Sequence, residues 1–326
     1  MAPKDHPGYA ILGESPEAGT SGFYLVLGAP RGGTTLIARA LARLGVFMGE
    51  KLPLTVEDPF LADMVVHKDW GGLGRTLEER TRKHGRSGWK FPQILLEEEG
   101  LEALPLQTRV LLVFRDVAAT AIRGTLSNAT AFREEARGAL RYHKKMLDFV
   151  EETDYPALAL SYEKLLLRPD QLAEGLGRFV GVGSPELLER VAGVVEPSPS
   201  VYRDRDNDEK RKARSAGLAA CIDSCDGGGI HGWAFLRADP GRPAELSFRF
   251  ESGLVRCVRA DLPRPDLKEA GLHPTGDCGF RLVLEDGERP LPGDYVEAME
   301  SVTGAEFEGS PFVYTRELTP EEKGLA

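Results

Sequence analysis

The sequence predicts an α/β domain, in which helices flank a parallel sheet, followed by a smaller all-β domain. Short apolar runs alternate with amphipathic helical stretches up to about residue 200, which is typical of parallel strands joined by helices. Beyond about residue 217 the helical periodicity stops. Short alternating runs between Gly, Pro and Asp turns then take over, as is typical of a β-sandwich. The length of 326 residues suits two domains.

The chain is expected to divide into four segments. These are a polar N-terminal lead-in over residues 1–21, the α/β domain over 22–200, a charged linker over 201–216, and a β-sandwich accessory domain over 217–326. The runs at 23–27, 109–114 and 157–160 are the strands that we expect in one parallel sheet, because continuous apolar runs indicate burial on both faces. A long helix is predicted over Phe132–Glu152, with Leu140 and Leu147 on its apolar face.

Composition limits the classes of function. The net charge is −10, with 20 acidic against 11 basic residues from residue 215 onward, so no nucleic-acid partner is expected. No run of about 18 apolar residues occurs, which argues against membrane insertion. The N-terminus shows no apolar signal-peptide core, so a cytoplasmic location is expected. Cys221 and Cys225 are spaced like half of a zinc site, but the other cysteines follow at irregular distances, and no metal is expected.

The most informative stretch is a strand, a glycine-rich turn and a helix between Phe23 and Gly45. Such a turn directs backbone N–H groups and the positive end of a helix at one point, which attracts phosphate or sulfate. Gly28 and Gly33 have the separation of a nucleotide-binding P-loop, and Thr35 stands at its hydroxyl position. The lysine position, however, is Thr34, and the nearest cation is Arg31 inside the turn.

The turn carries a family resemblance. The run Pro30-Arg31-Gly32-Gly33-Thr34-Thr35 resembles the 5′-phosphosulfate loop of sulfotransferases that use 3′-phosphoadenosine 5′-phosphosulfate (PAPS) and release 3′,5′-diphosphoadenosine (PAP). Gly32 stands where that family usually has Ser. The resemblance implies a P-loop-like parallel sheet, with the loop from Pro30 to Thr35 cradling the 5′-phosphosulfate.

A second part of the resemblance follows the strand at 109–114. That strand ends in Arg115, at the edge of the sheet where ligands of open α/β sheets bind. In the family, an Arg at this place binds the 3′-phosphate of PAPS, with the help of a Ser eight residues later. Here that later position is Arg123, which can itself bind phosphate in a bidentate manner, and Ser127 one turn on is a substitute.

Three further positions take their expected roles from the resemblance. Lys90, in a segment that resembles the family's Trp-x-Lys phrase, would neutralise charge on the leaving oxygen; the alternative is a surface lysine beside a half-buried Trp. Tyr162 would contact the adenosine, or else be a core tyrosine at a strand end. Arg203 or Arg205 would close over the cofactor from the charged segment 201–216.

Three side chains are candidates for the general base that deprotonates the acceptor. Glu57 and Asp58 match an acidic pair that precedes a helix near the acceptor pocket of bacterial members of the family. The alternative is that the pair only caps the helix that begins at Pro59. His67 is the third candidate, and its alternative is a structural role on that helix.

The last third also carries a resemblance. Gly232–Pro243, Ala260–Leu272 and Gly279–Leu284 resemble a small β-module appended to bacterial glycosyltransferases and sulfotransferases. Trp233 is either a platform for sugars or a core residue.

The sequence thus indicates transfer of a sulfuryl group from PAPS to a hydroxyl, or an amine, of a small-molecule or glycan acceptor. The alternatives are a P-loop kinase or NTPase, and a non-catalytic carbohydrate-binding protein on a degenerate scaffold. The oligomeric state is not predicted.

Overall fold

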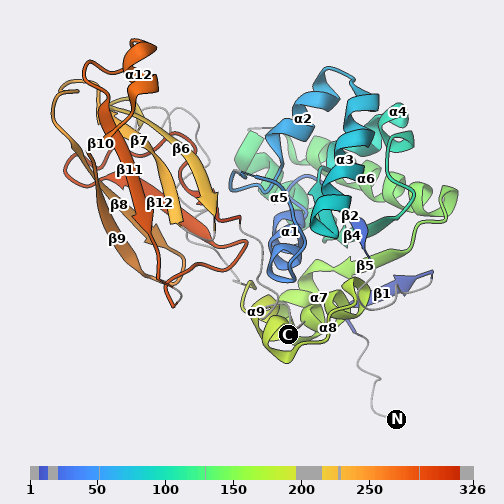
Figure 1. Ribbon diagram of the computed structural model, residues 1–326. Coiled ribbons are helices and arrows are strands. Elements are labelled where there is room, and N and C mark those ends of the chain that lie inside the picture. The colour runs from blue at the N-terminus through green and yellow to red at the C-terminus, as the bar shows by residue number, and fades with distance from the viewer. Residues whose placement is uncertain are drawn as a thin grey trace. The chain divides into compact units, whose positions relative to one another are not determined.

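The structure is a computed structural model (Figure 1), and it describes residues 7–13, 21–50, 52–128, 130–195, 215–226, 229–285 and 287–315. The chain falls into two compact units. The first comprises Met1–Glu50, Thr55–Pro197 and Leu318–Ala326, and the second comprises Lys51–Leu54 and Ser198–Glu317. Among the described residues, no helix combines the length and the apolar character needed to cross a bilayer.

The first unit is built on a five-stranded sheet of order β1-β5-β4-β2-β3. Its strands are β1 (Tyr9–Leu12), β2 (Gly22–Gly28), β3 (Arg86–Lys90), β4 (Thr108–Phe114) and β5 (Ala157–Ser161). The three expected strands, now β2, β4 and β5, run parallel, so the predicted parallel sheet is confirmed. Strand β3 adds to β2 in parallel, and β1 adds to β5 in antiparallel orientation. The polar lead-in expected before residue 22 therefore contains an edge strand.

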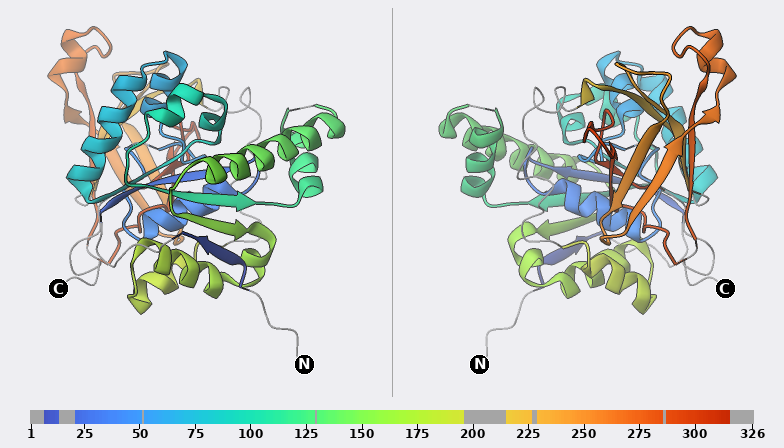
Figure 2. Two further views of the ribbon diagram at one scale, coloured as in Figure 1. Left: turned by 90° about the vertical axis from the view of Figure 1, so that its right-hand side faces the viewer. Right: turned by 90° about the vertical axis from the view of Figure 1, so that its left-hand side faces the viewer.

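Helices cover both faces of this sheet (Figure 2). Alternate side chains of β2 face opposite ways, as strand geometry requires. Phe23, Leu25 and Leu27 join a core that includes residues of α2, α3 and α6. Tyr24 faces the other way and meets Phe179 of α8 edge-on, with ring centroids 6.4 Å apart. The helical elements are α1 (Thr34–Arg43), α2 (Pro59–Val66), α3 (Trp70–His84), η1 (Pro92–Leu96), α4 (Glu98–Glu102), α5 (Val117–Asn128), α6 (Phe132–Glu152), α7 (Tyr162–Leu167), α8 (Pro169–Val180) and α9 (Pro185–Ala192).

Helix α6 has the predicted bounds but a different buried face. Leu140 and Leu147 were expected to face the core, yet they are 56% and 50% exposed. A neighbouring face of the helix carries the larger side chains, whose burial removes more apolar area from water. The buried residues are Ala139, Tyr142, Met146 and Phe149.

The second unit contains two four-stranded antiparallel sheets, of orders β10-β11-β7-β6 and β13-β12-β8-β9. The antiparallel β structure expected after residue 217 is confirmed. The two sheets share one apolar core, in which the rings of Phe248 and Phe280 lie 5.5 Å apart. The elements are β6 (Leu218–Asp226), β7 (Gly229–Leu236), β8 (Ala244–Phe250), β9 (Val255–Ala260), β10 (Leu262–Pro263), α12 (Pro265–Glu269), β11 (Asp277–Val283), β12 (Tyr295–Glu300) and β13 (Phe312–Val313).

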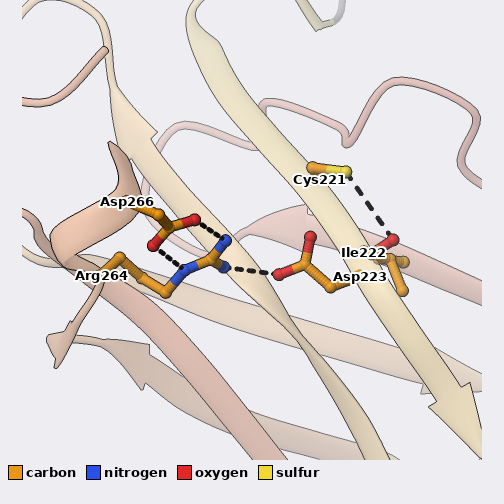
Figure 3. Close-up of polar contacts among 5 residues, drawn as sticks. All are labelled: Cys221, Ile222, Asp223, Arg264 and Asp266. Atoms are coloured by element: carbon orange, nitrogen blue, oxygen red, sulfur yellow. Dashed lines mark hydrogen bonds and ion pairs between the residues drawn. The ribbon is translucent and has the colours of Figure 1, made fainter. Parts of the chain in front are cut away.

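An ion-pair cluster ties α12 to strand β6 (Figure 3). The Arg264 guanidinium donates to Asp223 at 2.5 Å and, in a fork, to Asp266 at 2.9 and 2.7 Å. The thiol of Cys221 on the same strand donates to the carbonyl of Ile222 at 3.7 Å. Asp223 lies where the β6–β7 register shifts. The cluster thus has a structural role, because it holds the start of α12 against strand β6.

Candidate functional site

The anion loop, residues 28–35, begins with a type II turn. The amide of Gly32 donates to the carbonyl of Ala29 at 2.8 Å, and Pro30 and Arg31 are the two central residues. Proline fixes a negative φ at the first central position, and Arg31 has φ +64° at the second, which defines type II. That second position normally holds glycine. Here it holds a cation whose side chain is exposed, at a backbone cost of about 1–2 kcal/mol.

Glycine is required at two positions of the anion loop. A Cβ on Gly32 would lie 2.6 Å from the carbonyl oxygen of Ala29, so the usual serine of the resembled motif does not fit this turn. Gly33 has φ +91°, and a Cβ there would lie 2.2 Å from the ring of Tyr162. Thr34 follows as the first residue of α1, so the anion loop leads directly into a helix N-terminus.

Arg115, which follows β4, and Tyr162, which follows β5, support the anion loop. Arg115 follows β4, and its Nη1 donates to the carbonyl oxygen of Arg31 at 2.8 Å. The guanidinium lies over the ring of Tyr162, 4.8 Å from its centroid. Its Nε lies 3.9 Å from Glu163 and has no hydrogen-bond partner among the described residues. Tyr162 is thus a support for the loop at the end of β5.

Lys90 ends strand β3 and is almost fully buried, so the alternative of a surface lysine is wrong. Its ammonium donates to the carbonyl of Thr55 at 3.0 Å and to the carboxylate of Glu57 at 2.5 Å. The Thr35 hydroxyl donates to the same Thr55 carbonyl at 3.3 Å. Burial lowers the pKa of Lys90, Glu57 opposes that effect, and the positive charge of Arg31 adds to it.

Asp58 caps helix α2, which is the alternative that the sequence left open beside a role as general base. Its buried carboxylate accepts from the amides of Phe60 and Leu61, at 2.9 and 3.3 Å, at the start of α2. It also accepts from Arg80 at 2.6 Å. A carboxylate engaged by three donors inside the protein serves the helix and its ion pair.

Replacing Asp58 by Asn should therefore lower stability, while the rate of sulfuryl transfer, the activity that the resemblance implies, should stay within about threefold of wild type. Asn is as good an N-cap as Asp, but it cannot pair with Arg80, and breaking a buried charge-assisted bond costs about 1–3 kcal/mol. Asp58→Ala should lose about 1 kcal/mol more, because it also removes the cap. Urea unfolding and turnover of both variants test this. A folded Asp58→Asn protein with turnover reduced a hundredfold would identify Asp58 as the base.

His67 lies apart from the cluster around Lys90. It follows the last turn of α2, its side chain is 70% exposed, and its Nδ1 contacts the carbonyl of Asp63 at 2.9 Å. Asp58 caps the other end of the same eight-residue helix, about 12 Å away. The structure therefore does not bring His67 together with Glu57, Lys90 and the anion loop.

The two candidate partners of Arg115 lie on α5. Arg123 and Ser127 are half-buried. The Oγ of Ser127 is buried and has no hydrogen-bond partner among the described residues. Asp116 caps this helix by accepting from the amide of Ala119 at 2.7 Å. Arg203 and Arg205, like most of the charged segment 201–216, lie outside the described residues.

Two carboxylates near the anion loop were missed by sequence reasoning. Glu135 of α6 accepts from Asn128 at 3.0 Å and from Thr130. The hydrogen bond from Thr130 lowers the pKa of Glu135 most, followed by the one from Asn128, and the charge of Arg31 adds to them. Glu163 accepts from the amide of Asp116 at 3.0 Å. Glu163 follows Tyr162 in the resembled Tyr-Glu phrase, which was an available indication. Nothing local in the sequence marks Glu135, because its placement depends on how α5 packs on α6.

The turn geometry makes a prediction for Arg31. In Arg31→Gly, the free energy of unfolding should be unchanged or up to about 1 kcal/mol higher, because glycine adopts φ +64° freely but costs more chain entropy. If the anion loop holds PAP, as the resemblance implies, the affinity for PAP should nevertheless fall, because the cation is lost. Thermal unfolding and calorimetric titration measure the two effects. Arg31→Lys is the control that retains the charge, and equal PAP affinity in wild type and Arg31→Gly would exclude Arg31 from the anion site.

Trp233 lies on β7 and is half-buried, outside the apolar core of the second unit. Its ring stacks on that of Phe235 with centroids 5.8 Å apart. The alternative of a core residue is therefore wrong for Trp233.

Comparison with known proteins gives only distant likenesses. No protein-family model and no curated protein matches the chain. Twelve chains of solved structure match. One is the sulfotransferase domain of the Synechococcus PCC 7002 olefin synthase, at 19% identity over 57% of this chain and 85% of that one, with a TM-score of 0.40. Another is sulfotransferase STF9 of Mycobacterium avium, at 15% identity over 55% and 68%, with a TM-score of 0.34. A third is sulfotransferase STF1 of Mycobacterium tuberculosis H37Rv, at 14% identity over 53% and 71%, with a TM-score of 0.34. At this level of likeness the function has to be inferred from the residues of the chain itself.

Proposed function

We propose that the first unit transfers a sulfuryl group from PAPS to a hydroxyl, or less readily an amine, of a small-molecule or glycan acceptor. The observation that carries this proposal is the placement of three cations around the anion loop. Arg31 stands inside the turn, Lys90 ends β3, and Arg115 follows β4, and these two strands are the neighbours of β2. A compact, highly charged anion is the ligand that such a group of donors favours.

The residues present fit the two charged ends of PAPS. The amides of the anion loop and the start of α1 would hold the 5′-phosphosulfate. The 3′-phosphate would take Arg115 together with Ser127 or Arg123. In support, Arg115 Nε and Ser127 Oγ are buried atoms that lack a hydrogen-bond partner among the described residues, and a buried polar atom without a partner is costly unless a ligand satisfies it.

The chemistry follows from what a phosphosulfate supplies. A bond forms from the acceptor oxygen to sulfur, the bond from sulfur to the bridging phosphate oxygen breaks with its electron pair left on phosphate, and the acceptor proton passes to a base. Lys90 donates a hydrogen bond toward the oxygen on which charge develops, and Arg31 and the loop amides stabilise the sulfuryl oxygens. Side-chain cations thus take the task that a metal ion has in kinases.

The alternative of a P-loop kinase or NTPase is weaker on two grounds. Thr34 replaces the lysine that reaches the terminal phosphates. Asp116, the carboxylate that would have to bind magnesium, is engaged as the cap of α5.

Ligand binding separates these functions. We expect PAP to bind without magnesium, and labelled PAPS to pass its sulfuryl group to at least one member of a panel of glycans and small hydroxyl compounds. Tight binding of magnesium–ATP with no binding of PAP would refute the proposal. Binding of PAP with no transfer to any acceptor would favour the non-catalytic alternative. Calorimetry with PAP, and with ATP with and without magnesium, comes first because it needs no acceptor.

A further inference from the structure

We propose that Glu57 is a positioning residue for Lys90, which it holds in place and keeps charged, rather than the base that deprotonates the acceptor. This inference rests on the sulfuryl transfer proposed above. It concerns the pair formed by a carboxylate in the segment 55–57 and an ammonium at the end of β3, which lie 33 positions apart in the chain.

The hydrogen bonds of the Lys90 ammonium fix its orientation. A protonated lysine has three N–H donors. At Lys90, two of them are taken, by the carbonyl of Thr55 at 3.0 Å and the carboxylate of Glu57 at 2.5 Å. The third has no acceptor among the described residues. Two fixed acceptors define the orientation of the ammonium and leave one donor for a ligand.

The carbonyl of Thr55 places the Lys90 ammonium beside the anion loop. The Thr55 carbonyl accepts from Lys90 and also from the hydroxyl of Thr35, in the first turn of α1. One carbonyl thus connects the ammonium to the helix that starts at the loop. Protonation of Glu57 would remove the charge that holds this arrangement, so a base role and a holding role at Glu57 exclude each other.

The backbone between the two acceptors, at Val56, has an unusual conformation. Val56 has φ +57° and is buried, with 1% of its surface exposed. A β-branched residue in the left-handed region is a genuine outlier, because its side chain clashes with its own backbone there. This conformation lets residues 55 and 57 reach the same ammonium, one through its carbonyl and the other through its side chain. The strained conformation is therefore the one that supplies both acceptors.

The charges around Lys90 also give Glu57 a role. Lys90 is buried and lies within the field of Arg31, and both effects favour loss of its proton. Glu57 opposes them through its charge and its hydrogen bond. With Glu57 made neutral, the buried ammonium would lose this opposite charge and keep the like charge of Arg31. Glu57 thus preserves the positive charge that the transfer step requires of Lys90.

The test is a titration of Lys90 itself in the full-length protein without any ligand. Lysine labelled with ¹³C and ¹⁵N is followed by NMR against pH, and Lys90→Arg assigns the resonance. We expect the titration midpoint of Lys90 to fall by about one to three pH units in Glu57→Gln, and to return toward the wild-type value in Glu57→Asp. Asp148→Asn is the matched control, because Asp148 pairs with the surface residue Lys144, and it should not move the midpoint of Lys90.

The pH profile of transfer gives the second readout. For a positioning residue, Glu57→Gln keeps the acid limb of the kcat/KM profile and moves the alkaline limb to lower pH. For a general base, the same variant loses the acid limb, which would overturn the inference whether or not the Lys90 midpoint moves; an unchanged Lys90 midpoint would overturn it as well. A lowered Lys90 midpoint in a protein that transfers no sulfuryl group would support the pairing and refute the proposed function instead. The two failures are therefore distinguishable.

Discussion

Lys90→Met should lower kcat for sulfuryl transfer by about 10²–10³ while leaving the affinity for PAPS nearly unchanged. Removal of one preorganised donor that faces developing charge typically has an effect of this size. Methionine keeps the length of the buried apolar stem, so the packing around that stem is largely retained. The donor matters less to bound PAPS, because its bridging oxygen is still bonded to sulfur and gains charge only as that bond breaks. Single-turnover rates measured over a range of PAPS concentrations give both the rate and the affinity for PAPS.

Lys144→Met is the control for this comparison. Lys144 is an exposed lysine on α6 that pairs with Asp148 one turn away, so its loss should alter neither the rate nor the affinity. If Lys90→Met reduced the affinity for PAPS by the same factor as kcat/KM and left kcat intact, Lys90 would be a ground-state binding residue. Its assignment to the leaving oxygen would then be wrong.

Arg115→Ala should weaken PAP binding by roughly 10–150-fold, the equivalent of the 1.5–3 kcal/mol of a charge-assisted hydrogen bond. Two effects contribute. The guanidinium supplies donors for the 3′-phosphate, and its Nη1 also holds the carbonyl of Arg31 in the anion loop. If only the loop contact mattered, the affinities for PAPS and for adenosine 5′-phosphosulfate, which lacks the 3′-phosphate, would fall by the same factor.

Titration with both nucleotides separates these effects. If Arg115 binds the 3′-phosphate, Arg115→Ala loses affinity for PAP and little for the nucleotide without that group. Arg178→Ala is the matched control, because Arg178 is an exposed residue of α8 whose partner is Glu174. Unchanged PAP affinity in Arg115→Ala would refute the assignment of the 3′-phosphate site.

The core strands of the fold were predictable because their signal is local. Strands β2, β4 and β5 are short, continuous apolar runs, as is typical of strands that are buried on both faces of a sheet. Strand β3 was missed because Arg86–Lys90 contains a single large apolar residue, Trp89. Its pairing with β2 depends on contacts that its own composition does not reveal. On α6 the bounds were predictable, but two faces both carry apolar residues, and only packing against the sheet selects one.

The candidate site was predictable as far as a motif reached. Arg31, Lys90 and Arg115 were located by the residues that surround them in the sequence. The pairing of Lys90 with Glu57 and the packing of Tyr162 on Gly33 join distant parts of the chain, so they emerge only from tertiary structure. The sequence left the cap and the base as equal alternatives for Glu57 and Asp58. The structure separates the two neighbours, because Asp58 is buried under α2 while Glu57 meets Lys90.

The left-handed conformations of Arg31 and Val56 have a consequence for the evolution of this chain. Both residues occupy backbone positions that suit glycine or asparagine better. At the exposed Arg31, a library selected for thermal tolerance alone should accumulate such a substitution early, whereas the burial of the Val56 side chain offsets the gain there. The substitution of Arg31 would remove the cation from the turn. Retention of arginine at this place under prolonged heat selection would therefore require a simultaneous demand for ligand binding.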